Sequence, residues 1–159
     1  MPRPPRPRPA DVRIRAAKPS DLDALVALEQ AAFATDRISP RQWRLHLSGG
    51  SAAVLVATIG PSLVGAALLF FRQGSQVARL YSIAVDRDWR GHHVGERLLA
   101  AAERSAARRA RCLRLEVRED NAIARRFYAT RGYRPIGLRV GYYEDGANAL
   151  RFGKVLHPA

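Results

Sequence analysis

Three shortages in this sequence of 159 residues exclude whole classes of protein. Cys112 is its one cysteine, so no disulfide can form within the chain, and we expect the reducing environment of the cytoplasm. One cysteine and four scattered histidines offer too few ligands for a closed zinc site, so no metal is expected. The longest apolar run covers residues 63–71, whereas a membrane-spanning helix needs about 20 such residues. We therefore expect no membrane span.

Lysine is scarce as well, yet the chain is strongly basic. Lys18 and Lys154 are the two lysines, and arginines bring the basic total to 27 against 14 acidic residues, a formal net charge of +13. Such a field attracts anionic partners, which include nucleic acid, acidic protein surfaces and phosphate-bearing cofactors. Because the chain shows no nucleic-acid-binding motif, a simply basic surface is the favoured interpretation. Nucleic acid is an alternative partner that is not favoured.

Residues 1–9 differ in composition from the rest of the chain. They hold five of the ten prolines and three arginines, with no apolar side chain after Met1. Proline fixes φ and removes backbone donors, and nothing in this segment can be buried. We predict a disordered Pro/Arg tail over residues 1–9 and a single domain over residues 10–159. Without the tail, 24 basic and 14 acidic residues leave a net charge of +10.

Hydrophobic periodicity divides the domain into strands and helices. Strands are predicted over residues 12–16, 53–59, 63–72, 77–85, 112–117, 138–142 and 149–155, and helices from residue 19, after Ser39-Pro40, and over 95–109 and 122–131. Tight turns connect the three strands within residues 53–85, which predicts an antiparallel meander. A helix joins the strands over 77–85 and 112–117, which implies parallel pairing through a right-handed crossover. The predicted fold class is therefore α/β, with one mixed sheet.

The segment after the strand over 77–85 has the features of an anion site. It contains Arg90-Gly-His-His-Val-Gly95 and leads directly into a helix. The first turn of a helix leaves backbone N–H groups unpaired and its dipole favours negative charge, while glycines let phosphate oxygens approach the backbone. A plain tight turn would also explain two glycines before a helix, so both interpretations stay open on this evidence alone.

Arg90-Gly-His-His-Val-Gly95 resembles the acetyl-CoA loop of the GNAT superfamily of N-acetyltransferases, whose pattern is Gln/Arg-x-x-Gly-x-Gly/Ala. The resemblance implies the GNAT fold, with about seven strands and four helices, and acetyl-CoA as cosubstrate. It also implies that the loop wraps the CoA pyrophosphate and that the preceding strand end pairs with the pantetheine arm. The cofactor-binding residues implied in this way are Ile83, Ala84, Val85, Arg90, Gly91, His92, His93, Val94, Gly95 and Glu96.

His93 stands where the family has its middle glycine. Histidine tolerates unusual φ values better than β-branched residues do, so it could keep the backbone shape of glycine at a modest cost. Its imidazole could instead lie near phosphate and bind it better when protonated. In the third interpretation, the side chain weakens cofactor binding.

A longer motif covers residues 115–133 and resembles the RimI-like branch of the GNAT family, the protein N-terminal acetyltransferases. That branch has the pattern Leu-Glu-Val-Arg-x-x-Asn-x-x-Ala-x-x-x-Tyr-x-x-x-Gly-Phe/Tyr. The residues in register are Leu115, Glu116, Val117, Arg118, Asn121, Ala124, Tyr128, Gly132 and Tyr133. The match implies that Glu116 is the general base, acting through water, that Tyr128 is the general acid toward sulfur, and that Asn121 contacts the cofactor.

Each of these residues also has a structural interpretation. Glu116 alternates with apolar neighbours, which is typical of a solvent-facing strand residue. Tyr128 follows Phe127 on a helix and fits a core position, while Asn121 fits the N-cap of the helix that starts at residue 122. Cys112 is interpreted as a small buried strand residue rather than a nucleophile.

Fewer residues indicate the acceptor than indicate the cofactor. The resemblance implies that aromatic and acidic side chains flank the acceptor cleft, and the candidates are Phe33, Asp36, Arg37, Tyr142, Tyr143 and Glu144. An α-amine has a pKa near ~8 against ~10.4 for lysine, so a glutamate deprotonates it more easily. We predict an acetyl-CoA-dependent N-acetyltransferase that acts by direct attack in a ternary complex, with a protein N-terminal α-amine as the favoured acceptor. The alternatives are a small-molecule amine as acceptor, or a non-catalytic module that binds RNA or an acidic protein.

Overall fold

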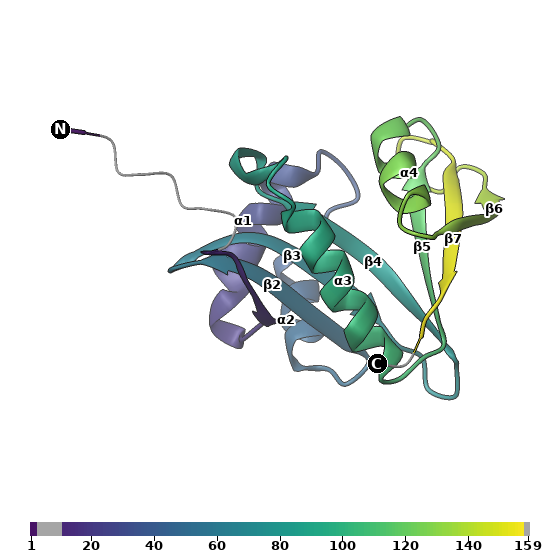
Figure 1. Cartoon of the computed structure of the whole chain (residues 1–159), viewed down its shortest axis with the longest axis horizontal. Helices are drawn as coiled ribbons and strands as arrows, with labels where there is room; N and C mark the ends of the chain where they lie inside the picture. The colour runs from purple at the N-terminus through teal and green to yellow at the C-terminus, as the bar shows by residue number, and fades with distance from the viewer. Residues whose placement is uncertain (3–10, 158–159) are drawn as a thin grey trace.

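A seven-stranded sheet forms the centre of the computed structural model, which describes residues 1–2 and 11–157 (Figure 1). Its strand order is β1-β2-β3-β4-β5-β7-β6. The strands are β1 Arg13–Ala16, β2 Ala52–Ile59, β3 Ser62–Phe70, β4 Val77–Val85, β5 Cys112–Arg118, β6 Arg134–Arg139 and β7 Ala149–Val155, and the helices are α1 Leu22–Ala32, α2 Pro40–Ser48, α3 Val94–Ala107 and α4 Ala122–Ala129. The predicted mixed α/β fold is confirmed, as is the parallel pairing of β4 with β5.

Local signals explain where most elements begin and end. Ser39 caps α2, since its hydroxyl accepts from the N–H of Gln42 and the Gln42 side chain accepts in return from the N–H of Ser39. The first helix begins at Leu22 rather than residue 19, because Pro19–Asp21 form a separate 3₁₀ turn.

The predicted strand over 138–142 is wrong in its bounds, because β6 runs from Arg134 to Arg139. The chain reverses early, after α4, where Gly132 has φ 88° and the N–H of Tyr133 donates to the carbonyl of Tyr128 at 3.2 Å. Pro135 is tolerated in β6 because this strand lies at the sheet edge. The predicted tail over residues 1–9 falls largely outside the described residues.

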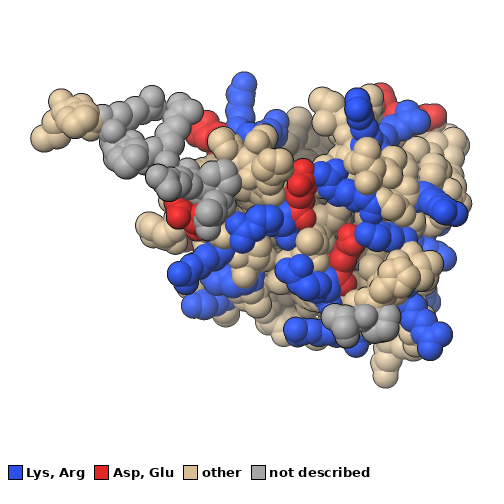
Figure 2. Space-filling view, viewed as in Figure 1, with Lys and Arg blue, Asp and Glu red and all other residues tan. Residues whose placement is uncertain are grey.

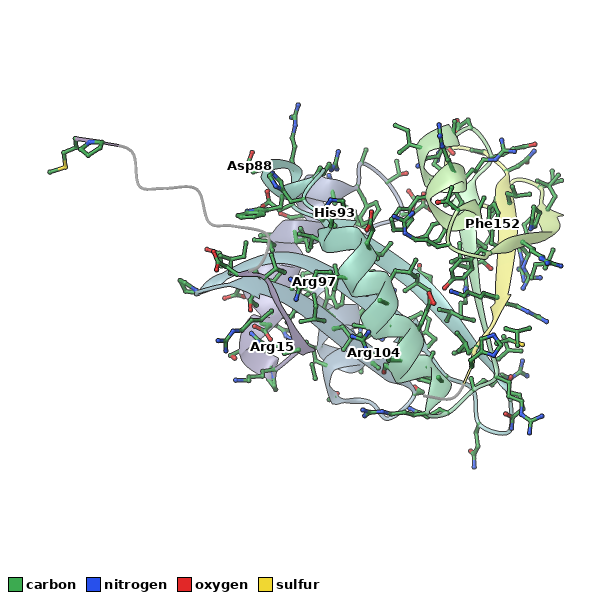
Figure 3. The ribbon with its side chains drawn as sticks, viewed as in Figure 1. Arg15, Asp88, His93, Arg97, Arg104 and Phe152 are labelled. Atoms are coloured by element: carbon green, nitrogen blue, oxygen red, sulfur yellow. The ribbon has the colours of Figure 1, made fainter. Side chains whose placement is uncertain are left out.

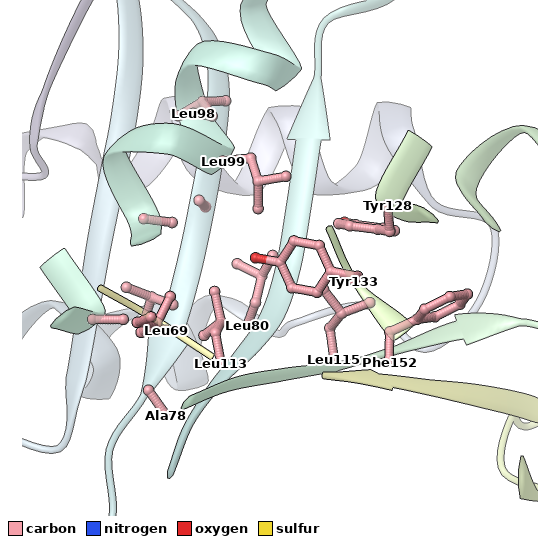
Figure 4. Packing of buried hydrophobic residues seen from close by; sticks show 14 of the residues in the cluster. Leu69, Ala78, Leu80, Leu98, Leu99, Leu113, Leu115, Tyr128, Tyr133 and Phe152 are labelled. Carbon is pink, nitrogen blue, oxygen red and sulfur yellow. The ribbon is translucent and has the colours of Figure 1, made fainter. Parts of the chain in front are cut away.

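Helices cover both faces of the sheet and divide the core in two. α1 and α2 pack on one face, against β2, β3 and β4, around the buried Leu25, Trp43 and Leu68. α3 crosses the other face, where Leu98 and Leu99 meet the strands (Figures 1 and 4). α4 continues that second layer over β5 and β7, with residues such as Tyr128, Tyr133 and Phe152 in the same core (Figure 4).

The surface over α3 is basic. Lys and Arg side chains are spread over this face, with few Asp and Glu side chains between them (Figure 2). Arg104 and Arg108 stand one helical turn apart on α3, and both are exposed. No helix within the described residues is long and apolar enough to cross a membrane.

β4 and β5 pair only over their first residues. Their parallel pairing ends at Leu80 and Leu115, although β4 continues to residue 85 and β5 to residue 118. At the same point Tyr81 is skipped in the pairing of β4 with β3, which is a β-bulge. The two strands therefore separate, and Figure 1 shows them diverging toward the end of the sheet where α4 and the start of α3 lie.

Gly65 on β3 sets how closely α3 approaches the sheet. A Cβ atom built on this glycine would lie 2.8 Å from Cδ1 of Leu98, 3.1 Å from the carbonyl oxygen of Ala84 and 3.2 Å from Cγ1 of Val94. The first turns of α3 thus rest directly on the backbone of β3. This contact fixes the position of the helix start that follows the loop over residues 86–93.

We predict that Gly65→Ala destabilises the protein by about 1–3 kcal/mol, because the added methyl group overpacks this contact. Urea denaturation of the wild type and the variant measures the difference. Gly50→Ala is the matched control, since a Cβ at Gly50 meets no atom within 4 Å. Equal unfolding midpoints for the two variants would contradict the packing assigned to Gly65.

Candidate active site

The loop between β4 and α3 has two residues in the left-handed region. Gly91 has φ 78°, and His93, the N-cap of α3, has φ 63° and ψ 14°. This conformation costs a non-glycine residue about 1–2 kcal/mol, and histidine is among the residues that adopt it more often. The geometry accords with the first of the three interpretations of His93, in which it keeps the backbone shape of glycine.

The start of α3 presents backbone donors rather than a capping side chain. Among the described residues, no side chain caps this helix terminus, so the N–H groups of its first turn point out of the helix. Gly95 lies between β4 and α4, where an added Cβ would be 3.7 Å from Val85 and 3.8 Å from Phe127. Figure 3 shows His93 at this end of α3. The predicted residues Arg90, His92 and Val94 lie in the same loop, with Arg90 exposed and Val94 buried.

Glu96 ties this loop to α4. Its carboxylate lies 3.2 Å from Nδ1 of His93 and 2.6 Å from Nη2 of Arg131. The bond from His93 and the charge of Arg131 hold the pKa of Glu96 below its ordinary value. The guanidinium of Arg131 in turn lies over the ring of Phe127, 4.0 Å from its centroid. The helix start and α4 are thus connected through charged side chains.

The end of β4 leaves one edge open toward β5. Ile83, Ala84 and Val85 pair with β3, and they lie beyond the point where pairing with β5 ends. Extended backbone with an unpaired edge accepts another extended chain by strand-like hydrogen bonding. The structure therefore brings these predicted residues next to the start of α3, as the sequence motif requires.

Glu116 is buried and held by arginines. Its side chain is 6% exposed, Oε2 accepts from Nε of Arg79 at 3.1 Å, and Oε1 is 3.7 Å from Nε of Arg151. The interpretation of Glu116 as a solvent-facing strand residue is therefore wrong. Arg79 also donates to the hydroxyl of Tyr142. Burial lowers the pKa of Arg79, but Glu116 and Tyr142 raise it more, so the guanidinium stays charged.

Arg79 was not predicted as a site residue. It lies on β4, 37 residues before Glu116 in the chain, in the alternating stretch in which Ala78 and Leu80 are buried. The parallel pairing sets Arg79 opposite Arg114, two residues before Glu116 on the same face of β5. The alternation of apolar and polar residues in β4, combined with the predicted pairing of β4 with β5, could have identified Arg79 as a neighbour of Glu116.

Tyr128 lies on the other side of the sheet, in the aromatic layer under α4. It is 6% exposed, and its ring contacts those of Phe127, Tyr133 and Phe152. Burial, with a smaller contribution from Tyr143, raises the pKa of Tyr128 well above its ordinary value. The phenol therefore stays protonated at neutral pH. Asn121 caps α4, because its Oδ1 accepts from the N–H of Ala124 at 3.0 Å.

Tyr143 lies within electrostatic reach of both candidate catalytic residues. Burial raises its pKa to about 12, with further contributions from Tyr142 and Glu116, and Tyr143 acts in the same way on Tyr128. Its ring meets that of Tyr142 edge-on at 5.0 Å. The segment between β6 and β7 thus places an aromatic pair at the opening between β4 and β5.

The two predicted acceptor segments meet through a backbone contact. Oδ1 of Asp36 accepts from the N–H of Glu144 at 3.2 Å. Arg37 is turned away, since its Nη2 donates to the carbonyl of Gln30 at 3.1 Å. Phe33 is the C-cap of α1 and packs at the edge of the core under that helix. Of these candidates, Asp36, Tyr142, Tyr143 and Glu144 come together and Arg37 does not.

A buried acid on α1, Glu29, was not predicted. It is 4% exposed, and its Oε1 accepts from the N–H of Ile38 at 2.9 Å. Burial raises the pKa of Glu29, and the bond from Ile38 and the charge of Arg37 oppose this only in part. The residues between α1 and α2 do not indicate, in the sequence, that the side chain of Glu29 faces the core.

Comparison with known proteins identifies the family. A family model for GNAT acetyltransferases matches residues 22–133. The chain belongs to the GNAT family of acetyltransferases. This GNAT enzyme is 37% identical over 142 residues to an uncharacterised N-acetyltransferase of Methanocaldococcus jannaschii, which covers 86% of this chain and 87% of that protein. The predicted family is thereby confirmed.

Two relatives of this GNAT enzyme are named for a more specific activity. A Bacillus subtilis protein with the name "Putative [ribosomal protein bS18]-alanine N-acetyltransferase" is 30% identical over 139 residues, which cover 86% of this chain and 91% of that protein. The crystal structure of the ribosomal-protein-S18-alanine N-acetyltransferase from Escherichia coli superposes with a TM-score of 0.82 at 26% identity, over 93% of this chain and 96% of that chain. The predicted similarity to the RimI-like branch is confirmed.

Two further side-chain features bear on the chemistry. Cys112 has a free thiol and is partly buried at the start of β5 rather than fully buried as expected. Within the described ranges, no three His, Cys, Asp or Glu side chains gather in a way that could hold a metal ion.

We predict that Glu29→Gln makes the protein more stable at neutral pH. A carboxyl group whose pKa is raised on folding stabilises the fold below its unfolded pKa and loses that contribution as pH rises through the folded pKa. Glutamine keeps an oxygen for the N–H of Ile38 and removes the buried charge. In urea denaturation, the gain should shrink as pH falls below the ordinary pKa of 4.5.

Glu29→Leu is the matched control, because it removes the charge and the acceptor together. It leaves the N–H of Ile38 without its partner, which costs about 1–3 kcal/mol. A gain in stability for Glu29→Leu, or a loss for Glu29→Gln at neutral pH, would contradict the role assigned to this carboxyl.

Proposed function

We propose that this enzyme transfers the acetyl group of acetyl-CoA to the N-terminal α-amine of a polypeptide, by direct attack in a ternary complex. One observation carries the proposal. Where β4 and β5 separate, the donor loop lies at one side, and the buried carboxylate of Glu116 and the buried phenol of Tyr128 lie near the opening, each within reach of Tyr143. Such a reaction fits the cytoplasm, the setting that the cysteine content favours.

The residues around this opening fit acetyl-CoA. The N–H groups at the start of α3 suit phosphate oxygens, Arg90 adds a positive charge, and Gly91 and Gly95 keep the backbone accessible. The unpaired edge over residues 83–85 suits the amide groups of the pantetheine arm. Acetyl-CoA, when bound, supplies an acetyl thioester. Asn121 adds a polar side chain beside this path, although its Oδ1 caps α4.

Glu116 is suited to accept the proton of the attacking amine through water. Arg79 occupies Oε2, whereas the closest cationic atom of Arg151 is 3.7 Å from Oε1, outside hydrogen-bond range. Oε1 thus has a lone pair for a water molecule that relays the proton. The two guanidinium groups also fix the carboxylate in place, which general base catalysis requires.

Tyr128 is suited to donate a proton to the departing sulfur. Because burial raises its pKa, the phenol is protonated at neutral pH and acts only as a donor. Proton transfer from its hydroxyl oxygen to the sulfur avoids release of a free thiolate. Counted from the neutral amine, the nitrogen loses one proton to Glu116 and the sulfur gains one from Tyr128. Water then takes the proton from Glu116 and returns one to Tyr128, so both residues regain their starting states, and the extra proton of an ammonium form leaves to water before the attack.

Its acid–base chemistry and the names of similar proteins both support an α-amine as the acceptor. Its pKa is about 2 units lower than that of lysine, so a carboxylate needs less help to deprotonate it. Tyr142 and Tyr143 form an aromatic wall that suits the start of an extended polypeptide. The two relatives described above are named for N-acetylation of an alanine of ribosomal protein S18.

Glu116→Gln and Tyr128→Phe should each lower kcat about 100-fold, because each removes one proton-transfer group. Mass spectrometry of a short N-terminal peptide incubated with acetyl-CoA measures the rate and shows which amine is acetylated. Glu103→Gln and Tyr133→Phe are matched controls. Glu103 pairs with Lys154 away from the opening, and the buried hydroxyl of Tyr133 has no hydrogen-bond partner among the described residues. Unchanged turnover in both test variants would refute these roles.

Acetyl-CoA should bind with a Kd in the micromolar range, about −8 kcal/mol, in calorimetric titration of the wild type. His93→Gly should bind within about threefold of the wild type, because both residues reach the left-handed conformation. Binding by the glycine variant alone would show that His93 blocks the loop. Loss of binding in both proteins would overturn the proposed function and favour a non-catalytic binding module.

A further inference from the structure

Three arginines line up across four strands on one face of the sheet, with a glycine at the remaining position. The pairing registers place Arg79 of β4 opposite Arg114 of β5, Arg114 opposite Gly153 of β7, and Gly153 opposite Arg134 of β6. We call Arg79, Arg114 and Arg134 the arginine row. Like charges in directly opposite strand positions are destabilising. Arg79 and Arg114 form such a directly opposite pair, and an anion beside Arg114 would offset their repulsion as Glu116 does at Arg79.

Only one member of the row has a protein anion. Arg79 is bonded to Glu116, whereas Arg114 and Arg134 are exposed and form no ion pair within the described part of the chain. Arg151 lies opposite Glu116 on β7, two residues from Gly153, and its buried Nε has no hydrogen-bond partner within the described residues. The face thus has unused guanidinium groups next to the candidate general base.

The face is open and partly apolar. α1 and α2 pack against β2, β3 and β4, and on the same face of the sheet Arg114 of β5 and Arg134 of β6 stay exposed. Because Gly153 has no side chain, the side chains of Arg114 and Ile136 lie close over its backbone. A Cβ built on Gly153 would lie 3.8 Å from Cγ of Arg114 and 3.3 Å from Cδ1 of Ile136. Ile136 is 48% exposed and Val155 64% exposed. Both features suit contact with an extended chain.

We infer that Arg114 and Arg134 bind acidic side chains of the acceptor polypeptide, downstream of the acetylated N-terminus. The inference rests on the proposed function, because it takes Glu116 as the place of the acceptor amine. Arg114 is two residues from Glu116 along β5, about 7 Å, and Arg134 is two strands further, about 10 Å. An extended chain covers this span in about three to five residues. The enzyme therefore prefers acceptors with Asp or Glu at those positions.

A polypeptide fits this face better than RNA. Bases of single-stranded RNA are bound by stacking on exposed aromatic rings. Phe152, the one aromatic residue in β5, β6 and β7, is buried on the opposite face, and Tyr81 and Tyr142 beside the row are already engaged by the guanidinium of Arg79. The row is also continuous with the site of the acceptor amine, so the acceptor chain itself comes within reach.

The test uses two peptides with the same length and the same first two residues. One has Asp and Glu at positions 3 to 5, and the other has Asn and Gln there. With wild-type enzyme and acetyl-CoA, kcat/KM should be about fivefold higher for the acidic peptide, through KM, as two exposed charge pairs predict. The preference should fall as salt screens the charges. Arg114→Gln/Arg134→Gln should abolish it and leave the neutral peptide unaffected.

Arg104→Gln/Arg108→Gln on α3 is the matched control, since it removes two exposed arginines from the far face and should keep the preference. Arg114→Glu/Arg134→Glu should reverse it toward a peptide with Lys at positions 3 to 5. Equal kcat/KM for the acidic and neutral peptides would overturn the inference and leave the proposed function intact.

A binding measurement separates the two proposals. Fluorescence anisotropy of the same peptides, labelled at their C-termini, reports binding without turnover. If the wild type binds the acidic peptide in an Arg114- and Arg134-dependent way but acetylates neither peptide, the proposed function fails and the surface assignment stands. If a single-stranded RNA of equal charge displaces the acidic peptide more effectively than unlabelled acidic peptide does, the assignment to a polypeptide is wrong.

Discussion

The separation of β4 from β5 is the constraint on which the rest of the structure depends. Hydrogen bonding between these parallel strands ends at Leu80 and Leu115, and the sheet still continues because β5 pairs along its whole length with β7 and the end of β4 pairs with β3. Two strand edges in the middle of the sheet thus have backbone groups that are free to bond to another molecule. A long sheet interior normally offers none, since every backbone group in it is paired. The core on both faces holds the strands in this arrangement.

Arginine rather than lysine suits the way charge is used around this opening. Arg79 bonds Glu116 and Tyr142 at once, and Arg131 bonds Glu96 while it lies on the ring of Phe127. A guanidinium presents five donors in a fixed planar fork and can stack flat on a ring, whereas an ammonium group offers three donors from one nitrogen. The high arginine content is therefore partly structural. This accounts for charge that composition alone would assign to solubility or to nucleic acid.

Local signals made most of the fold predictable from the sequence, and distant contacts limited the rest. Ser39-Pro40 and the turn glycines act over a few residues, so α2 and the meander were found. β6 was misplaced because Pro135 and Gly137 resemble a loop, although an edge strand tolerates them. The positions of Glu116 and Tyr128 followed from a family motif. The burial of Glu116 did not, because it depends on Arg79, 37 residues away.

The contact between Asp36 and Glu144 has a consequence for what can reach the opening. It is one exposed hydrogen bond between two surface segments, and such a bond contributes about 1 kcal/mol. Thermal energy breaks it often, and neither core layer has to move. A free chain end needs a narrower passage between these segments than an internal loop, because a loop enters as two strands. The width of the passage therefore favours chain ends over internal loops before any side chain of the acceptor is recognised.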